Sequence, residues 1–251
     1  MSKTKSIPSV EAVNQRVLAV HDVLGFNHVD TTPPGRPIIS GKTTGRIEHT
    51  LLKAGASFAD VDRLCKEATK YGFRSVCCLP GDVARCKRIL KGTDVLVVTV
   101  IDFPLAGGTT GDVTTQCAHA IEQGADEVDV VQNIRAIRMD DLHAARDKVA
   151  SVVWAAGAKR VKVILETGLL SFDQIVDSCA VIEAGGAHFV KTCTGFGPRG
   201  AFLDDIHIMR RAVGDRLGIK ASGGIKNRET ADAMIEAGAD LLGTSSGPEC
   251  I

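Results

Sequence analysis

A phrase that occurs three times along the chain is the strongest constraint on its fold. Each copy runs from a helix-like Ile-Glu through glycine into a short apolar segment, and the copies begin at Ile121, Ile182 and Ile235. A glycine that ends a helix just before an apolar strand is typical of alternating helices and strands. The copies are separated by roughly twice a βα unit of about 30 residues, so a further strand–helix pair is expected between them.

Apolar segments at these spacings predict eight strands, near residues 45–52, 73–79, 94–102, 127–132, 161–166, 187–192, 218–222 and 240–243. Eight alternating units with near-continuous apolar strands favour a parallel (β/α)8 TIM barrel over residues 44–251. A doubly wound open sheet is the alternative. No G-x-G-x-x-G pattern follows the first strand, which argues against a dinucleotide-binding version of that sheet.

An extra N-terminal helix and a linker are expected in residues 1–43. Apolar residues recur there at helical spacing, followed by Gly25: Val10, Val13, Val17, Val20 and Leu24. This pattern predicts an amphipathic helix. We expect it to plug the bottom of the barrel or pack on its side, with partner binding or targeting as the alternative role. A Pro/Gly-rich linker follows from Thr31 to Arg36.

Charge and cysteine usage narrow the range of partners and compartments. The chain has 30 Lys and Arg against 30 Asp and Glu, so its net charge gives no reason to expect nucleic acid or an anionic membrane as a partner. No apolar run is long enough to span a bilayer, and residues 1–8 lack the apolar core of a secretory signal. The eight cysteines lie mostly in apolar patterns, which indicates a reduced, cytoplasmic protein. The histidines lack metal-ligand spacing, so no metal or other cofactor is expected.

The alternation of side chains along a strand predicts which charges point into the barrel. On the fifth strand Lys162 and Glu166 oppose an apolar face, and on the fourth Asp129 lies between two valines. The same phase turns three further residues inward: Glu48, Lys191 and Lys220. The interior is therefore expected to hold three acids and three lysines, a balance that a buried polar cluster requires.

Lys191 is the candidate nucleophile of this cluster. It lies on an apolar strand that runs directly into a glycine turn. A buried ammonium must be paired or lose its proton, and a neutral lysine amine forms Schiff bases with carbonyl compounds. Lys191, Lys220 and Asp129 all lie toward the C-terminal ends of their strands, where active sites of barrels form. For Lys162 and Glu166 a structural salt bridge is an equally good interpretation.

Glycine-rich turns after the last three strands indicate an anion site. They span residues 194–200, 222–226 and 243–247, and the last two bring Lys226, Ser245 and Ser246 with them. Backbone N–H groups of glycines approach anions closely, and barrels often bind phosphate with the loops after strands seven and eight. Ordinary tight turns would use the same glycines.

Seven motifs in order resemble the deoxyribose-phosphate aldolase family from about residue 45 to the C-terminus. They begin at Ile47, Ser75, Glu127, Val161, Phe189, Lys220 and Gly243, and include Phe189-Val-Lys-Thr-Cys-Thr-Gly195 and Lys220-Ala-Ser-Gly-Gly224. The resemblance implies metal-free cleavage of 2-deoxy-D-ribose 5-phosphate to acetaldehyde and D-glyceraldehyde 3-phosphate. It also implies a dimer or tetramer.

The resemblance also implies roles for individual residues. Lys191 stands at the position of the Schiff-base lysine, Lys220 at that of the second lysine, which lowers the pKa of the first, and Asp129 at that of the acid/base carboxylate. Five residues stand at phosphate-binding positions: Gly195, Gly223, Gly224, Ser245 and Ser246.

Departures from the family pattern leave two alternatives open. Glu48 replaces a common Asp, Leu79 a frequent Asn, Cys193 a Ser and Lys226 the usual Arg; Asp102 stands where Gly is frequent and is expected to add a carboxylate near the mouth. One alternative is a Schiff-base aldolase for another phosphorylated sugar. The other is a catalytically silent barrel with a regulatory binding role.

Overall fold

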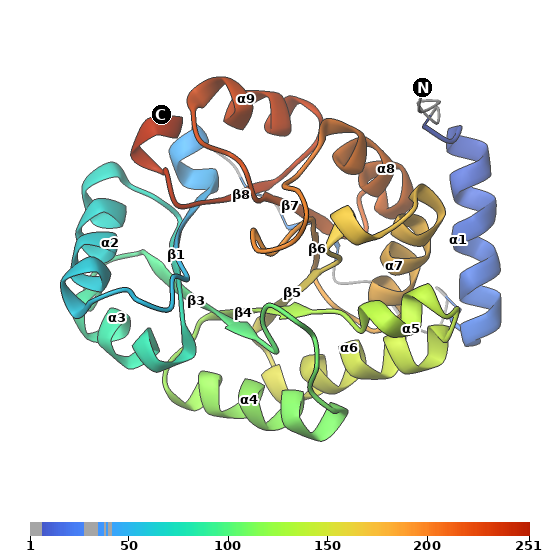
Figure 1. Ribbon diagram of the computed structural model, residues 1–251, viewed down its shortest axis with the longest axis horizontal. Coiled ribbons are helices and arrows are strands. Elements are labelled where there is room, and N and C mark those ends of the chain that lie inside the picture. Colours follow the sequence, from blue (N-terminus) through green and yellow to red (C-terminus); the bar gives the residue numbers. More distant parts are fainter. Residues whose placement is uncertain (1–6, 28–34, 38, 40–41) are drawn as a thin grey trace.

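Eight parallel strands close into a single barrel in chain order. The computed structural model describes residues 7–27, 35–37, 39 and 42–251. The last strand pairs with the first, which closes the ring and excludes the open sheet (Figure 1). The strands are β1 (Ile47–Leu51), β2 (Ser75–Cys78), β3 (Leu96–Ile101), β4 (Glu127–Val131), β5 (Arg160–Ile164), β6 (Phe189–Lys191), β7 (Gly218–Ser222) and β8 (Leu241–Thr244).

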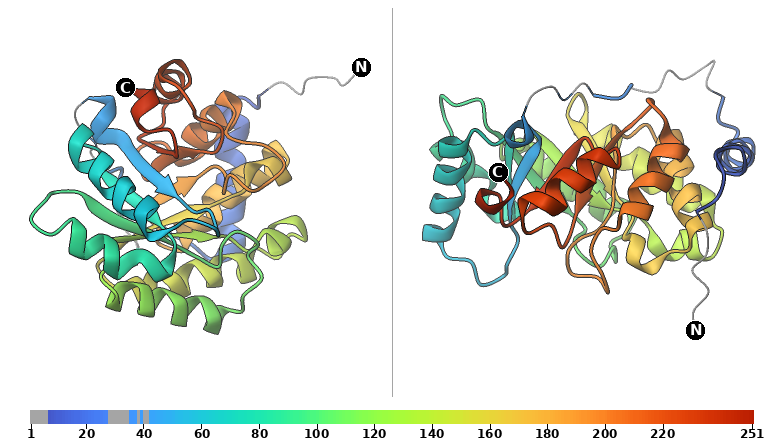
Figure 2. Two further views of the ribbon diagram at one scale, coloured as in Figure 1. Left: turned by 60° about the vertical axis from the view of Figure 1, so that its left-hand side comes forward. Right: turned by 90° about the horizontal axis from the view of Figure 1, so that it is seen from above.

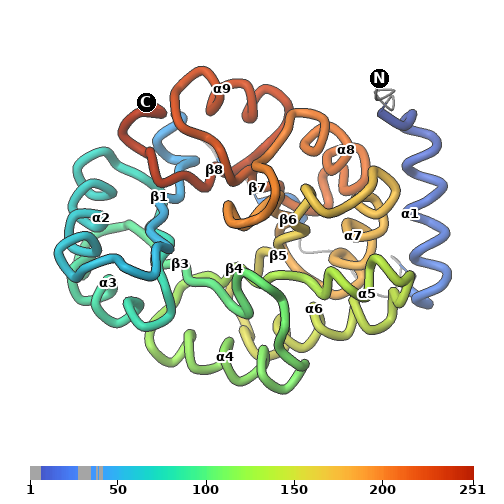
Figure 3. The backbone as a smooth tube through the Cα atoms, viewed as in Figure 1, coloured from blue at the N-terminus to red at the C-terminus, as the bar shows by residue number. Residues whose placement is uncertain are grey.

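Helices surround the strands on the outside of the ring (Figure 3). They are α2 (Phe58–Tyr71), α3 (Val83–Ile89), α4 (Thr110–Glu122), α5 (Ile134–Arg138), α6 (Leu142–Ala156), α7 (Phe172–Ala184), α8 (Leu203–Val213) and α9 (Arg228–Glu236), with short 3-10 turns η1 (Thr43–Arg46), η2 (Pro80–Asp82), η3 (Thr167–Leu169) and η4 (Pro248–Cys250). Capping boxes fix several helix starts, at Ser57, Thr109 and Ser171. The predicted (β/α)8 barrel is confirmed.

The repeated glycines turn the chain from helix to strand. Gly124, Gly186 and Gly238 have φ angles of 103°, 80° and 115°. Residues with a Cβ atom rarely adopt this region, so glycine is needed where the chain reverses. The sequence repeat therefore reflects the helix-to-strand turn that these three units share.

Alternation along the strands separates an outer apolar layer from a polar interior. Val128, Val130, Val161 and Val163 belong to the main apolar core. The intervening residues face inward, and the strand register places Asp129 beside Lys162. Two residues further along, Lys191 pairs with Ile164 and Lys220. The register thus brings these charged side chains to adjacent levels inside the ring.

The N-terminal helix α1 (Val10–Leu24) packs on the side of the barrel, next to α7 and α8 (Figure 2). Its buried face contains Val13, Val17, Val20 and Leu24, as predicted, whereas Val10 is exposed. Arg16 donates two hydrogen bonds of 2.6 Å to Asp177 of α7. Gly25, in the left-handed conformation, ends the helix.

Parts of the predicted linker and N-terminus lie outside the described residues, namely residues 1–6 and 31–34. Arg36 is described, and its guanidinium contacts Asp215 and Asp240. The division into a segment 1–43 and a barrel 44–251 stays a prediction. None of the helices in the described ranges has the length and apolar character needed to cross a membrane.

Candidate active site

Three lysines from neighbouring strands converge on one carboxylate, Asp129. The distances from their Nζ atoms to the nearest Asp129 oxygen are 3.1 Å for Lys162, 2.7 Å for Lys191 and 2.6 Å for Lys220. All four side chains are buried. Side-chain alternation alone placed these groups correctly inside the barrel. We call Asp129, Lys191 and Lys220 the mouth cluster.

A second group of charges lies one level deeper and is called the floor network: Glu48, Arg74, Glu127 and Lys162. Lys162 lies 2.6 Å from Glu127 and 3.2 Å from Glu48. Arg74 donates to both acids, at 3.0 Å to each through one nitrogen, and a second nitrogen contacts Glu127. Glu48 also contacts Lys220, which joins the floor to the mouth. The half-exposed Arg160 approaches Glu127 from the rim.

The charges of these buried groups balance without Lys191. The three acids are Glu48, Asp129 and Glu127, and the cations that contact two or more of them are Arg74, Lys162 and Lys220. Lys191 contacts Asp129 alone among the described carboxylates. An uncompensated buried charge is costly, so the surplus amine is the group that loses its proton.

The pKa directions agree with this balance. Burial lowers the pKa of Lys191, and the positive charge of Lys220 lowers it further. The Asp129 carboxylate raises this pKa, but by less. Burial alone would also lower the pKa of Lys220, but Asp129 and Glu48 outweigh it and raise that pKa above its usual value. Lys162 behaves like Lys220, because Asp129, Glu127 and Glu48 surround it. The two lysines of the mouth cluster are therefore driven toward opposite protonation states.

Two acids of the network, Asp129 and Glu127, have pKa values below the usual range. Burial would raise the pKa of Asp129, but the charges of Lys162, Lys191 and Lys220 hold it well below its usual value. The pKa of Glu127 falls to about 2, because Lys162 and Arg74 overcome the effect of burial. Asp129 can therefore accept a proton beside a neutral amine, which is the arrangement that general acid–base chemistry needs.

Glu166 was predicted to join the buried charged network and does not, whereas Glu127 and Arg74 belong to it and were not predicted. Glu166 lies beyond the end of β5 with φ of 58°, so strand alternation no longer directs it. Its carboxylate is buried against Thr194 instead of the lysines. Glu127 is the third acid of the network instead. It lies two residues before Asp129 on β4, so strand alternation could have predicted its inward direction. Arg74 lies inside the predicted strand 73–79 but precedes the observed β2, so the alternation of the strand does not fix the direction of its side chain.

The glycine-rich loops form a pocket at the C-terminal ends of β6, β7 and β8. The pocket has a volume of about 370 Å³. Five of the predicted phosphate-binding residues line it: Gly195, Gly223, Gly224, Lys226 and Ser245. The three glycines have φ angles between 80° and 89°. Gly200 packs so closely on Gly223 that a Cβ atom would lie 2.3 Å from its carbonyl oxygen. These glycines therefore shape the pocket, and their exposed backbone suits an anion.

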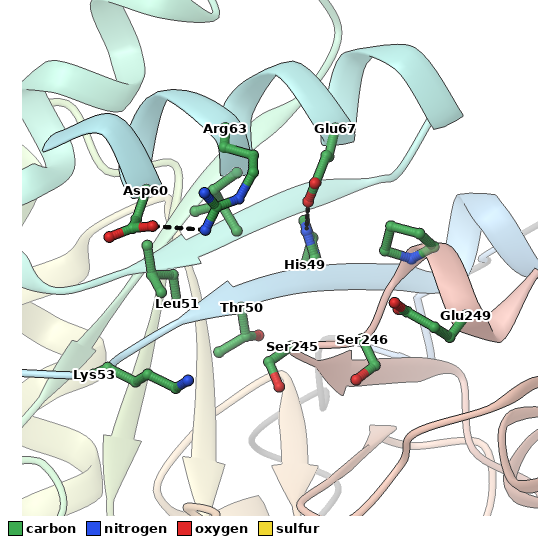
Figure 4. Close-up of a pocket in the computed structure, with 12 residues that line it drawn as sticks. His49, Thr50, Leu51, Lys53, Asp60, Arg63, Glu67, Ser245, Ser246 and Glu249 are labelled. Carbon is green, nitrogen blue, oxygen red and sulfur yellow. Dashed lines mark hydrogen bonds and ion pairs between the residues drawn. The ribbon is translucent and has the colours of Figure 1, made fainter. Parts of the chain in front are cut away.

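Ser246 lines an adjoining pocket and not the first one. Figure 4 shows this second space between β1, α2 and η4, with His49 paired to Glu67 and Arg63 paired to Asp60. Lys53 lines both pockets, and its side chain reaches toward Ser245. Its place in the sequence gave no signal of this role, because it follows β1 as an exposed residue outside the strand pattern.

Asp102 does not add a free carboxylate to the mouth. Its side chain contacts the buried Lys148 of α6 at 2.6 Å and accepts the Gly108 N–H at 2.9 Å. Its φ of 50° explains why glycine suits this position. The expectation that Asp102 would place a carboxylate near the mouth is corrected by this pairing.

An apolar wall lies on the β1–β3 side of the interior, across the ring from Lys191. It consists of Leu52, Cys77, Val98 and Val100, with Leu79 and Phe103 packed against it. Val100 is the strand partner of Asp129, so the wall meets the charged cluster at the same level. A molecule attached to the Lys191 amine would therefore have apolar side chains on one side and the anion pocket on another.

Within the described ranges, His, Cys, Asp and Glu form no group of three or more that could hold a metal ion.

Comparisons with known proteins agree with this geometry. A family model described as DeoC/LacD family aldolase matches residues 46–249. Deoxyribose-phosphate aldolase of Streptococcus uberis is 46% identical over 82% of this chain and 93% of its own, and that of a Geobacillus species is 48% identical over 80% and 91%. The tetrameric deoxyribose phosphate aldolase of Aeropyrum pernix superimposes with a TM-score of 0.78 at 29% identity, covering 97% of each chain.

Proposed function

The chain belongs to the DeoC/LacD family of aldolases, and from this we propose that it cleaves 2-deoxy-D-ribose 5-phosphate reversibly to acetaldehyde and D-glyceraldehyde 3-phosphate. It is a carbon–carbon lyase of class I, the class that forms a Schiff base with a lysine. The observation that carries the assignment of the nucleophile is the charge balance of the buried network. Lys191 is the amine left without an acid of its own.

The proposed reaction begins at the open-chain aldehyde of the substrate. The neutral Lys191 amine adds to C1, and loss of water gives an iminium. The C3 hydroxyl gives its proton to Asp129, directly or through water and Lys220, and the C2–C3 bond breaks. Its electrons move into the iminium to form an enamine, and D-glyceraldehyde 3-phosphate leaves. A proton returned to C2 and hydrolysis then release acetaldehyde and restore Lys191.

Lys220 and Lys162 have different proposed roles although both are buried. Lys220 contacts Asp129 at 2.6 Å, as Lys191 does at 2.7 Å. Its positive charge favours the neutral form of Lys191 and can supply a proton through the shared carboxylate. Lys162 lies in the floor network and fixes the orientation of Asp129 from below.

The glycine pocket is the proposed phosphate site. Gly195, Gly223, Gly224, Ser245 and Lys226 line it, and Lys53 adds a second cation. No described carboxylate lies within ion-pair distance of either lysine. Ser246 is proposed to act from the adjoining pocket, through the loop that it shares with Ser245.

The apolar wall favours a 2-deoxy sugar over the alternative of another phosphorylated sugar. A hydroxyl at C2 would lie against Leu52, Cys77, Val98 and Val100, which offer no good hydrogen-bond partner. The pairing of Asp102 with Lys148 also removes one reason for expecting a changed substrate.

The direct test is the cleavage of 2-deoxy-D-ribose 5-phosphate by wild type and Lys191→Ala, with EDTA present. We expect turnover in wild type that the chelator does not affect and that the variant lacks. Activity that survives in Lys191→Ala would refute the assigned nucleophile. Ribose 5-phosphate and fructose 1-phosphate, assayed in parallel, test the sugar. Their cleavage in preference to the deoxy sugar would favour the alternative substrate class.

We further propose a homo-oligomer, a dimer or tetramer, in the cytoplasm. The tetrameric relative from Aeropyrum pernix supports the first proposal. All eight cysteines are free and buried, which supports the second, because such thiols are usual in reducing compartments.

A further inference from the structure

Two phenylalanine rings meet across the mouth of the barrel. Phe103 follows β3 and Phe196 follows β6, and their ring centroids lie 5.5 Å apart at an interplanar angle of 88°. This edge-to-face geometry is favourable for aromatic pairs. Figures 1 and 3 show that β4 and β5 lie between β3 and β6 along the shorter arc of the ring. The ring contact therefore joins loops that follow non-adjacent strands. We call the two rings the aromatic bridge.

The aromatic bridge is not explained by core packing. Phe196 is 58% exposed and lines the anion pocket beside Gly195. Phe103 packs on the apolar wall that contains Cys77 and Val100. The bridge therefore borders both the phosphate end of the pocket and the apolar side that faces Lys191.

On the β3 side, Phe103 is held by its neighbour Asp102. The Asp102 carboxylate joins Lys148 of α6 to the Gly108 N–H, and the Asp102 N–H donates to Gln116 at 2.9 Å. The Ala106 N–H closes the turn on the Asp102 carbonyl at 3.1 Å. These bonds fix the loop to α4 and α6, so the ring of Phe103 has little freedom to withdraw.

On the β6 side, Phe196 is held by Glu166. The Glu166 carboxylate accepts hydrogen bonds from the Thr194 hydroxyl and N–H, and the Thr194 hydroxyl oxygen accepts the Phe196 N–H at 3.0 Å. A Cβ atom on Gly197 would lie 2.6 Å from a Glu166 oxygen, so the carboxylate fills the space beneath the loop. Glu166, turned away from the lysines, thus supports the opposite end of the bridge.

We propose that Phe103 and Phe196 are specificity-determining residues that limit the aldehyde donor on Lys191 to an unsubstituted two-carbon unit. This inference rests on the proposed function. The carbon that becomes the nucleophile, C2 of the enamine, lies between the lysine and the apolar wall, with the bridge above it. An added methyl group must displace a ring that is anchored on both sides. An added hydroxyl must be buried against apolar carbon.

The test compares two aldehyde donors in addition to D-glyceraldehyde 3-phosphate, acetaldehyde and propanal. We expect Phe196→Ala to raise the ratio of kcat/KM for propanal over acetaldehyde by about tenfold, the usual scale for one methyl group in an apolar pocket. Phe103→Ala is expected to act in the same direction. Because the rings touch, the double variant should show less than the product of the single effects.

Phe202→Ala is the matched control. Phe202 is 57% exposed on the same loop, but it stacks on Arg199 at 4.3 Å and does not line the pocket. Its donor ratio is expected to stay within about twofold of wild type. If Phe103→Ala does not fold, Phe103→Leu replaces it, since leucine keeps the apolar contact and removes the ring.

The outcomes separate this inference from the proposed function. Borohydride trapping of wild type with acetaldehyde, read as a mass increase on the Lys191 peptide, is measured first. No adduct would overturn the Schiff-base function and this inference with it. An adduct in wild type with an unchanged donor ratio in Phe196→Ala, or an equal change in Phe202→Ala, would overturn the inference alone.

Discussion

The floor network and the mouth cluster use the same kinds of side chain for different ends. At the floor, Lys162 lies within 3.2 Å of three carboxylates. At the mouth, Lys191 has only Asp129, which it shares with two other lysines. Both amines are buried. The number of acids around each, and not its burial, therefore decides which one keeps its proton.

This difference shows how a barrel can make a reactive amine without exposing it. Charge pairing holds the cations of the floor network in place. One of them, Lys162, contacts Asp129 and fixes its orientation from below. Lys191 must share Asp129 with two other cations, so its pKa is lowered and its neutral form is favoured. Five substitutions, each affecting a different lysine, test this difference between the floor network and the mouth cluster.

The largest effect is expected for Lys191→Met. Loss of the nucleophile should lower kcat/KM for 2-deoxy-D-ribose 5-phosphate by about 10⁴-fold or more. Because the remaining charges balance, the free energy of unfolding in urea should stay within about 1 kcal/mol of wild type. A strongly destabilised variant would contradict the claim that Lys191 is the surplus group.

Lys162→Met should show the opposite pattern. Its removal leaves three acids against two cations in a buried site, and breaking such pairing costs about 3–5 kcal/mol. Urea unfolding measures the loss. Asp129 also loses a partner, so activity should fall, but the borohydride adduct should still form on Lys191. Unchanged stability would mean that the floor network does not carry the charge balance.

Lys220→Met should change both rate and pH dependence. We expect kcat/KM to fall by about 10²–10³-fold, the scale of a lost acid–base partner. Activity needs a neutral Lys191, so it is lost as pH falls through the pKa of that amine. Burial lowers this pKa and the charge of Lys220 lowers it further. Removing Lys220 should raise the pKa and move the acidic limb of the kcat/KM profile to higher pH. A limb that stays in place would contradict the coupling.

Asp102→Gly tests Lys148, a buried lysine outside the active site that pairs with the single carboxylate of Asp102. Lys148 would remain buried without its carboxylate, a loss that relief of the left-handed backbone at residue 102 partly offsets. We expect a net destabilisation of about 2 kcal/mol in urea. Asp102→Asn, which keeps the side-chain length, is the control for charge. A gain of activity in Asp102→Gly would show that the carboxylate does affect the mouth.

The smallest effect is expected for the exposed Lys53. Lys53→Met should raise KM for the phosphorylated sugar about threefold to tenfold, since exposed charge pairs contribute little. The kcat/KM for unphosphorylated deoxyribose should not change. Lys91→Met, which removes another exposed lysine between α3 and β3, is the control. Equal effects in both variants would exclude a specific role for Lys53.

The sequence predicted the barrel and the lysines because both follow from short-range patterns. The glycine repeats mark turns, and strand alternation pointed Lys162, Lys191, Lys220 and Asp129 inward. Arg74 and Lys53 lie just outside the observed strands, although Arg74 fell inside the predicted strand 73–79. Alternation does not fix the direction of side chains there, so their contacts depend on tertiary structure.

The expectation for Glu166 came from strand alternation and that for Asp102 from its place in the family pattern, and the local backbone explains the outcome at both positions. Both have positive φ angles, 58° and 50°, that reverse the direction of the side chain at the end of a strand. Alternation assumes an extended backbone and cannot anticipate this. Their actual partners, Thr194 and Lys148, are distant in the sequence.

The most direct test of the account is the protonation of Lys191 in the free protein. Lysine labelled with ¹³C at Cε reports each amine by NMR during a titration, and Lys191→Met and Lys162→Met assign the signals of these two among the four buried lysines. We expect the signal lost in Lys191→Met to titrate at lower pH than the exposed lysines, while the signal lost in Lys162→Met stays charged over the same range. A Lys191 signal that remains protonated together with the exposed lysines would contradict the inference that Lys191 is the surplus amine of the buried network.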